Sequence, residues 1–213
     1  MGYLGAVIYL ASQSPQRAML LSRAGVEFTV VPSAGDEESI NTPQPQLLAL
    51  DRAKHKARGA QLPPGADGTV IGADTVVALG NKVYGKPAND AEAFAILSAL
   101  QGTTHTVFTG HHAIRVVDGV LGIEASGLAI AKVTMRLLTP EAIRAYLATG
   151  EHRGRAGAYA IQETGDRFVS EMHGSWGTVV GLSVSTVIKL HRELTDEVLM
   201  PTGPTTRTFT RNR

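Results

Sequence analysis

The stretch AVIYLASQSPQRAMLLSRAG, residues 6–25, sets the start of the fold. An apolar run at residues 7–10 passes through a polar turn into a helical pattern. Ser14 suits the N-cap of that helix, Pro15 its first position and Gly25 its C-terminal end. We therefore expect a strand, a turn and a helix in direct succession.

The turn itself is suited to binding an anion. A helix N-terminus presents unpaired N–H groups and the positive end of the helix dipole, which together favour phosphate. Ser12 and Ser14 add hydroxyl groups, and Arg17 in the first helical turn adds a planar cation. The alternative is a capped helix whose Arg17 points into solvent, because capped helix starts are common.

The composition is that of a globular protein. The 213 residues are 43% apolar and 18% charged, and the net charge of +1 gives no strong global attraction for polyanions. There is no cysteine, which excludes disulfides, thiolate nucleophiles and zinc–thiolate sites and makes a reducing cytoplasm the natural location. The N-terminal apolar stretch lacks a basic leader, and no run approaches 18 apolar residues, so we expect neither a secretory signal nor a membrane span.

Strand and helix patterns alternate along the rest of the chain, which predicts a single α/β unit with two lobes. The tail from residue 195 onward has little to bury, and we expect it to be mobile. The expected elements are a strand in 25–33, a helix over 45–60, a strand pair in 69–87 turning at Gly80 and Asn81, a helix from Asn89 through Leu100, a meander over 104–138 broken at 118–119 and near 126–127, a helix after Thr139 and Pro140, a strand over 167–172 and a last helix over 185–194.

Two charged residues stand in unusual places. Asp74 lies in the middle of the apolar run VIGADTVV, where a carboxylate costs desolvation unless it is paired, hydrogen-bonded or bound to a metal. Lys86 lies in the tight turn GKP, as a phosphate-binding lysine would, although no Walker frame surrounds it. The alternatives are a solvent-facing strand position for Asp74 and a solvated turn for Lys86.

Other polar residues give weaker signals. The acidic loop 36–38 could hold a hard cation such as Mg²⁺, although most acidic loops are simply solvated. Gln162, in AGAYAIQ, carries an amide able to read a base edge or to serve a structural role. His111 and His112 lack metal-ligand spacing and are expected on opposite faces of a strand. Trp176 is expected to be a packing residue.

The sequence contains no Ser/His/Asp elbow, no dinucleotide-binding glycine motif and no zinc signature. What remains is a set of anion-binding donors and carboxylates without a nucleophile. This combination favours metal-assisted hydrolysis of a phosphate anhydride by water.

Taken in order, a series of blocks resembles the Maf family of nucleotide pyrophosphatases. The blocks are LASQSPQR, the DEE loop, RAKHKA, VIGADTVV, GKP, TGHHAI, TPEAIRAYLATGE, AGAYAIQ and VVGLS, and they span residues 6 to about 194. The resemblance implies a mixed, twisted α/β sheet with flanking helices, similar to the inosine-triphosphate-type pyrophosphatases. It implies one domain over residues 1–194, followed by a tail over 195–213, and usually a homodimer.

The resemblance also implies an activity and roles for single residues. The activity is cleavage of a nucleoside triphosphate to a monophosphate and pyrophosphate with a divalent cation, Mg²⁺ or Mn²⁺. Asp74 would accept a proton or organise the metal, and Glu37 would be a second metal partner. Positive groups around the bridging oxygen would stabilise the developing charge. The residues expected to contact the phosphates are Ser12, Arg17, Lys56 and Lys86.

Base preference in this family is implied by three positions. Thr75 and Gln162 match the branch that acts on dTTP and UTP, whereas the branch acting on 7-methyl-GTP has Trp, Gln and Glu at the three places. Gln16 departs from both, because Arg or Trp is expected there, and it lacks the charge and bidentate reach of an arginine. Ala160 also replaces the usual glycine of its block.

The predicted function is therefore a dTTP/UTP pyrophosphatase that could also accept modified pyrimidine nucleotides. One alternative is a pyrophosphatase for 7-methyl-GTP or another modified nucleotide. A second alternative is a non-catalytic, nucleic-acid-binding or cell-division regulator. The near-neutral charge argues against nucleic acid as a partner, since neutralising several phosphates takes a basic surface. The basic footprint in the sequence consists of Arg52, Lys54, Lys56 and Arg58.

Overall fold

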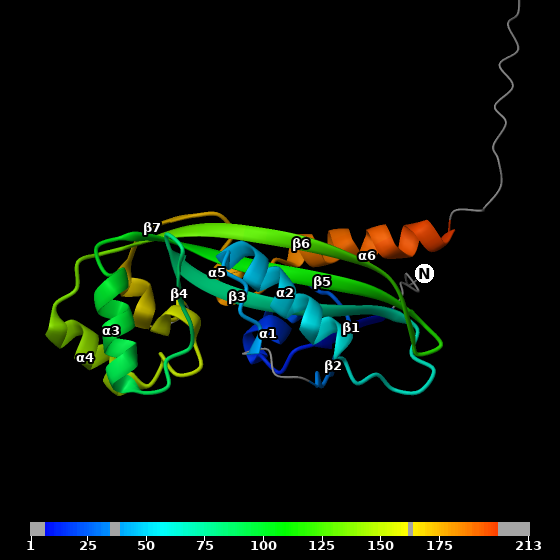
Figure 1. Cartoon of the computed structure of the whole chain (residues 1–213), viewed down its shortest axis with the longest axis horizontal. Coiled ribbons are helices and arrows are strands. Elements are labelled where there is room, and N and C mark those ends of the chain that lie inside the picture. Colours follow the sequence, from blue (N-terminus) through cyan, green and yellow to red (C-terminus); the bar gives the residue numbers. More distant parts are fainter. Residues whose placement is uncertain (1–6, 35–38, 162–163, 200–213) are drawn as a thin grey trace, which may run out of the picture.

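In the computed structural model, which describes residues 7–34, 39–161 and 164–199, seven strands form one mixed sheet (Figure 1). Their order is β2-β1-β3-β5-β6-β7, and β4 pairs with the C-terminal end of β3. β1 runs parallel to both β2 and β3, and all other neighbours are antiparallel. The strands are β1 (Val7–Ala11), β2 (Phe28–Val31), β3 (Gly68–Leu79), β4 (Lys82–Tyr84), β5 (Thr104–Val117), β6 (Val120–Met135) and β7 (Val169–His173).

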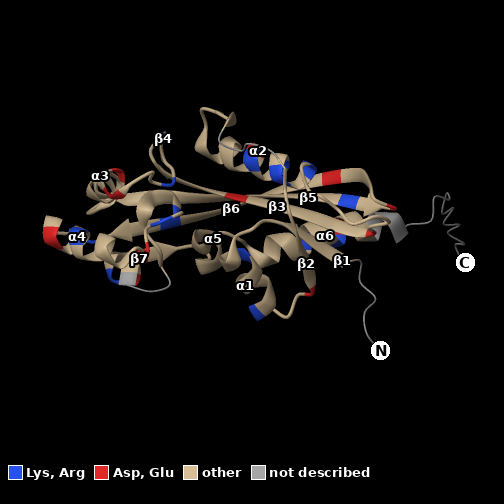
Figure 2. Cartoon of the chain, turned by 90° about the horizontal axis from the view of Figure 1, so that it is seen from below, with Lys and Arg blue, Asp and Glu red and all other residues tan. Residues whose placement is uncertain are grey.

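Helices cover both faces of the sheet and one of its ends. α2 lies on one face, while α1, α5 and α6 lie on the other (Figure 2). α3 and α4 gather at the end near β4 and β7, which gives the expected second lobe (Figure 1). The helices are α1 (Pro15–Arg23), α2 (Pro45–Arg58), α3 (Asp90–Leu100), α4 (Pro140–Thr149), α5 (Trp176–Val180) and α6 (Val184–Leu199), with 3₁₀ turns η2 (Ala156–Ala158) and η3 (Thr164–Phe168). The predicted mixed α/β sheet with flanking helices is confirmed.

The predicted helix starts are also confirmed, with one difference in how they are capped. The side chains of Asn89 and Thr139 each accept the backbone N–H three residues on, which caps α3 and α4. Ser14 holds the cap position of α1 but makes no such bond. Instead, Ser12 Oγ accepts the backbone N–H of Ser14 at 3.3 Å. Ser12 therefore shapes the turn before α1.

Two glycines let α2 lie directly on the sheet. A Cβ on Gly72 of β3 would lie 2.3 Å from the carbonyl oxygen of Ala53, and one on Gly110 of β5 would lie 2.3 Å from that of Ala49. Ala49 and Ala53 are fully buried in this contact. The close approach brings the next turn of α2 within reach of the middle of β3.

Two large apolar clusters fill the two lobes. One packs Leu10 and Ile71 of the sheet against Leu21 of α1 and Leu190 of α6. The other fills the space around α3, α4 and the adjoining end of the sheet. Trp176 packs against both clusters, as expected of a packing residue.

The prediction of a meander over residues 104–138 is wrong about the number of strands. β5 and β6 form one long hairpin that turns at Asp118 and Gly119, both with positive φ. The second predicted break, at Ser126 and Gly127, does not occur, because β6 continues through it. A Cβ on Gly127 would lie 2.6 Å from Thr186 Cγ2, so this glycine makes room for α6 and does not end a strand.

The last helix runs further than expected. α6 extends to Leu199, and Thr195 Oγ1 donates to the carbonyl oxygen of His191 at 2.9 Å. Residues 195–199, which were counted with the expected tail, continue this helix, and the expectation that the tail is mobile stays a prediction. Residues 200–213 lie outside the described residues, and the single-domain boundary stays a prediction. No helix in the described ranges combines the length and hydropathy needed to cross a bilayer.

Candidate active site

A cavity of about 450 Å³ is lined by segments from both lobes. Its wall consists of the β1–α1 turn, Ser33 after β2, one residue of α2, the middle of β3, the turn after β4, the segment around η2 and the end of α5. Glu37 and Gln162, two of the predicted site residues, lie outside the described residues. The predicted residues that the fold brings together on this wall are Ser12, Gln16, Arg17, Lys56, Asp74, Thr75 and Lys86.

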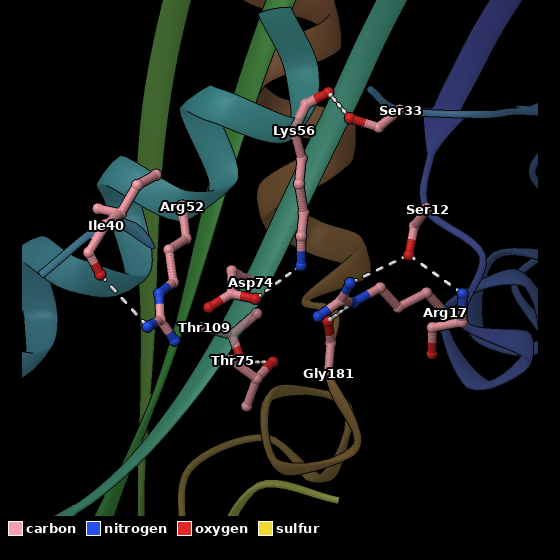
Figure 3. A network of polar contacts seen from close by, with 11 residues as sticks. Ser12, Arg17, Ser33, Ile40, Arg52, Lys56, Asp74, Thr75, Thr109 and Gly181 are labelled. Carbon is pink, nitrogen blue, oxygen red and sulfur yellow. Dashed lines mark hydrogen bonds and ion pairs between the residues drawn. The ribbon is translucent and has the colours of Figure 1, made fainter. Parts of the chain in front are cut away.

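Asp74 projects from β3 toward the end of α2 (Figure 3). Its Oδ1 accepts a hydrogen bond from Lys56 Nζ at 2.7 Å. Its residue exposure is 6%, so the alternative of a solvent-facing strand position is wrong. Oδ2 is buried and has no hydrogen-bond partner among the described residues. A buried carboxylate oxygen without a partner is costly and marks a place where a proton, a cation or a donor can bind.

Lys56 comes from the last turn of α2, whose backbone is held by Ser33: the Ser33 hydroxyl donates to the Lys56 carbonyl oxygen at 2.8 Å. Burial, with the nearby positive charges of Arg17 and Lys86, lowers the pKa of Lys56 to about 8. Asp74 acts in the opposite direction through its charge and hydrogen bond. Lys56 is therefore a cation at neutral pH that loses its proton in the mildly alkaline range.

Arg17 is buried under the β1–α1 turn (Figure 3). Its Nε donates to the carbonyl oxygen of Gly181 at 2.9 Å, and Nη1 donates to Ser12 Oγ at 3.0 Å. Burial lowers the pKa of Arg17, and the charge of Asp74 opposes that shift. The alternative in which Arg17 points into solvent is wrong, because the guanidinium is fixed beside the cavity.

The loop that holds Arg17 is itself held by a histidine. His111 Nε2 accepts the backbone N–H of Ser183 at 2.9 Å, two residues after Gly181. Burial, with the charge of Arg17, lowers the pKa of His111 to about 4, so the ring is neutral at neutral pH. His112 bonds Ser126 and Glu124 on the other side of β5, as expected for neighbours in a strand.

Thr75 follows Asp74 and also reaches the cavity. Its Oγ1 lies 3.0 Å from Thr109 Oγ1. Because the Thr109 hydroxyl donates to the carbonyl oxygen of Thr178 at 2.7 Å, the Thr75 hydroxyl is the donor of this pair. The Thr75 hydroxyl oxygen therefore keeps its lone pairs for accepting a further hydrogen bond.

Arg155 and Tyr159 are among the cavity residues that the sequence analysis missed. Arg155 immediately precedes the AGAYAIQ block, and nothing in its local pattern separates it from a solvated loop arginine. Tyr159 lies inside that block, and its hydroxyl lies 2.8 Å from His105 Nε2. Only the folded chain brings these two residues to the same wall as the β1–α1 turn.

A divalent cation fits this donor set when it arrives with phosphates. No group of three His, Asp or Glu side chains within the described residues could hold a metal by itself. Mg²⁺ needs only one or two carboxylates when substrate phosphates and water supply its other ligands. The unpartnered Oδ2 of Asp74 would be available as one such ligand, and the acidic loop 36–38 lies outside the described residues.

The basic residues of α2 do not form one free cationic surface. Lys54 and Arg58 both bind Glu124, at 3.2 and 2.6 Å. Lys56 turns into the cavity, and Arg52 donates to a backbone carbonyl oxygen at 3.3 Å. The four basic residues considered as a nucleic-acid-binding surface therefore make separate contacts within the protein.

The chain is similar in sequence to a family of known proteins and to named nucleotide pyrophosphatases. The family model described as Maf-like protein matches residues 7–194. A dTTP/UTP pyrophosphatase of Thermococcus kodakarensis is 42% identical over 91% of this chain and 99% of its own length. One of Moorella thermoacetica is 43% identical over 86% and 92%. A solved structure of a nucleoside-triphosphatase / dITP/XTP pyrophosphatase from Mycobacterium abscessus aligns with 92% of this chain and 99% of its own chain, at 15% identity and a TM-score of 0.40.

Proposed function

Since the chain belongs to the Maf-like protein family, we propose that it hydrolyses dTTP and UTP to the nucleoside monophosphate and pyrophosphate. Relatives named dTTP/UTP pyrophosphatase match nearly the whole chain at about 42% identity, which supports the choice of dTTP and UTP as substrates. The observation that carries the proposal is the unpartnered oxygen of Asp74, buried in one cavity with Lys56 and Arg17.

The cations of the cavity bind the triphosphate. Arg17 and Lys56 are held in place before the substrate arrives, because each already has a fixed hydrogen-bond partner. Lys86 adds a third positive charge at the cavity wall. Ser12 offers a hydroxyl group beside the helix N-terminus of α1. Preorganised donors of this kind stabilise charge on transferring phosphates without reorganising during the reaction.

Asp74 acts on the attacking water. The water oxygen forms a bond to the α-phosphorus while the bond from that phosphorus to the α–β bridging oxygen breaks. The water proton passes to Asp74 Oδ2, and pyrophosphate leaves with the electron pair of the broken bond. Lys56, bound to Oδ1, fixes the orientation of the carboxylate. Arg17 and Lys56 balance the negative charge that grows on the leaving group.

A divalent cation, Mg²⁺ or Mn²⁺, would neutralise phosphate charge and acidify a bound water. Asp74 would hold it, with Glu37 as the second carboxylate that the family resemblance implies. In that arrangement one oxygen of Asp74 serves the cation or the water, and the other stays on Lys56. We further propose a homodimer, to be checked by light scattering coupled to size exclusion.

The experiment is a panel of nucleotides with each cation. The purified chain is mixed with dTTP, UTP, CTP, GTP, ATP and 7-methyl-GTP, and both pyrophosphate and monophosphate are measured. We expect dTTP and UTP to give the highest kcat/KM, with equal amounts of the two products. Brisk hydrolysis of 7-methyl-GTP beside negligible activity on dTTP and UTP would transfer the function to the modified purine. Tight, salt-sensitive DNA binding without any hydrolysis would contradict an enzymatic function.

A further inference from the structure

Gln16 and Arg155 meet at the cavity wall although they come from different lobes. The Gln16 amide satisfies its neighbours when its oxygen faces the Arg155 guanidinium. In that orientation the oxygen accepts from Nη2 at 2.9 Å and Nη1 at 3.2 Å, and the amide nitrogen donates to Ser14 Oγ at 3.1 Å. The reverse orientation sets the amide N–H groups against guanidinium donors, so the hydrogen-bond network assigns the first.

Arg155 is carried by an anchored segment. Its N–H donates to the carbonyl oxygen of His152 at 3.2 Å, and its own carbonyl oxygen accepts from Ala158 at 3.1 Å. The buried His152 side chain lies 3.0 Å from Asp90 Oδ1, at the start of α3. The next residues are tied to the turn after β4 by a bond from Gly157 N–H to the carbonyl oxygen of Gly85 at 3.1 Å. The guanidinium is therefore presented to the cavity from a fixed backbone.

The pair presents donors without a matching negative charge. The Gln16 oxygen is neutral, and no carboxylate within the described residues forms an ion pair with Arg155. A guanidinium has five N–H groups, and Gln16 occupies only part of them. Gln16 lacks the charge of an arginine, and Arg155 brings that charge to the same place from the opposite lobe. A half-buried cation at a cavity wall with free donors is a site for an oxygen acceptor.

We propose that Arg155, held in position by Gln16, is a substrate-binding residue that donates hydrogen bonds to an oxygen acceptor of the nucleotide. The acceptor is either a carbonyl oxygen of the pyrimidine base or a phosphate oxygen, since both fit the same donors. The inference rests on the proposed function only in taking a nucleoside triphosphate as the ligand. Gln16 is a positioning residue here, because it acts through Arg155.

The test measures binding and turnover separately in Arg155→Met, with Arg153→Met as the matched control, because Arg153 is an exposed neighbour that does not line the cavity. Calorimetry gives the Kd of α,β-imido-UTP and of α,β-imido-CTP, and steady-state assays give kcat/KM for UTP and CTP. We expect Arg155→Met to weaken α,β-imido-UTP binding roughly tenfold to a hundredfold, as loss of a charged hydrogen bond does, and Arg153→Met to leave it unchanged.

The two ligands distinguish the acceptors. A loss confined to the uridine ligand, which has a second carbonyl oxygen where cytosine has an amino group, assigns the base. An equal loss for both ligands assigns an acceptor that they share, either the O2 carbonyl oxygen or a phosphate oxygen, and tripolyphosphate, which carries no base, separates these two: its binding weakens in Arg155→Met only if the contact is to phosphate. Gln16→Met tests the positioning role: it should weaken binding in the parent chain but add little in the Arg155→Met background.

Unchanged affinity of a folded Arg155→Met for both ligands would overturn the inference, and strictly additive effects would overturn the role of Gln16. If the parent chain binds neither ligand and hydrolyses no nucleotide, the proposed function fails instead. Thermal unfolding of each variant separates a lost contact from a lost fold. Restored binding in Arg155→Lys would support a need for charge alone, and its continued loss a need for the planar fork.

Discussion

Lys56 Nζ lies 2.7 Å from Asp74 Oδ1, between side chains that are only 12% and 9% exposed. One belongs to a helix and the other to the central strand, and the glycines beneath α2 let the two elements approach. Lys56 binds Oδ1 of the carboxylate, and Oδ2 has no hydrogen-bond partner among the described residues. The arrangement thus prepares a carboxylate for a second ligand, which in our account is a water or a cation.

The lowered pKa of Lys56 predicts an alkaline limit to activity. Below its pKa of about 8 the side chain is charged and binds phosphate, and above it the charge is lost. We expect kcat/KM for UTP, which reports the free enzyme, to fall as the pH rises through about 8. In Lys56→Arg the falling limb should move to higher pH, because a guanidinium keeps its proton. Identical alkaline limbs in the two proteins would remove Lys56 from this role.

The packing of α2 predicts a cost for a single methyl group. Gly72→Ala should lower the free energy of unfolding by roughly 1–3 kcal/mol, as overpacking does, and reduce turnover by displacing the helix that carries Lys56. Gly85→Ala is the control, since nothing lies within 4 Å of its Cβ position and its φ is not positive. Chemical denaturation measures the free energy of unfolding of both variants, and a steady-state assay measures their turnover. Equal stability of Gly72→Ala and the parent would contradict the close approach of α2.

The buried histidines predict acid sensitivity. Burial lowers the pKa of both His105 and His111 to about 4, so the folded chain binds fewer protons than the unfolded chain below pH 6.5. Stability should therefore be complete above pH 6.5 and fall as the pH drops toward 4. His111→Gln keeps an acceptor for the Ser183 N–H but cannot be protonated. Thermal unfolding from pH 7.5 to 4 should show a weaker pH dependence in this variant, and an unchanged dependence would contradict it.

The metal account predicts that cation and nucleotide bind together. Since no described group of three ligands could hold a metal alone, Mn²⁺ should bind the free chain weakly and bind more tightly with α,β-imido-UTP present. Chelation should abolish turnover, and Mg²⁺ or Mn²⁺ should restore it. Calorimetric titration of Mn²⁺ with and without the nucleotide measures the coupling. Tight Mn²⁺ binding that neither the nucleotide nor Asp74→Asn affects would place the cation elsewhere.

Local signals in the sequence were sufficient for much of the fold. The turn from Ser12 to Pro15, the cap at Asn89 and the hairpin turn at Asp118 each depend on a few neighbouring residues, and each was predicted. Gly127 was misread as a strand break because a glycine in a β pattern fits either a bend or a close approach. Its reason for being glycine lies in α6, far along the chain.

The site was predictable where burial alone made a residue unusual. Asp74 stands out because a carboxylate in an apolar strand needs a partner, and the structure supplies Lys56. Arg155 does not stand out, because its meeting with Gln16 depends on how two lobes fold against each other. Glu37 and Gln162 lie outside the described residues, so their roles stay predictions.

The most direct test of the account replaces Asp74 by asparagine and measures turnover and binding separately. The amide keeps the size of the side chain and an oxygen for Lys56 but cannot take a proton. We predict that kcat for UTP falls by at least about a hundredfold. The affinity for α,β-imido-UTP in the absence of added cation should stay close to that of the parent chain, and the exposed Asp166→Asn should change neither. A folded Asp74→Asn that turns over UTP at the parent rate would contradict the central claim.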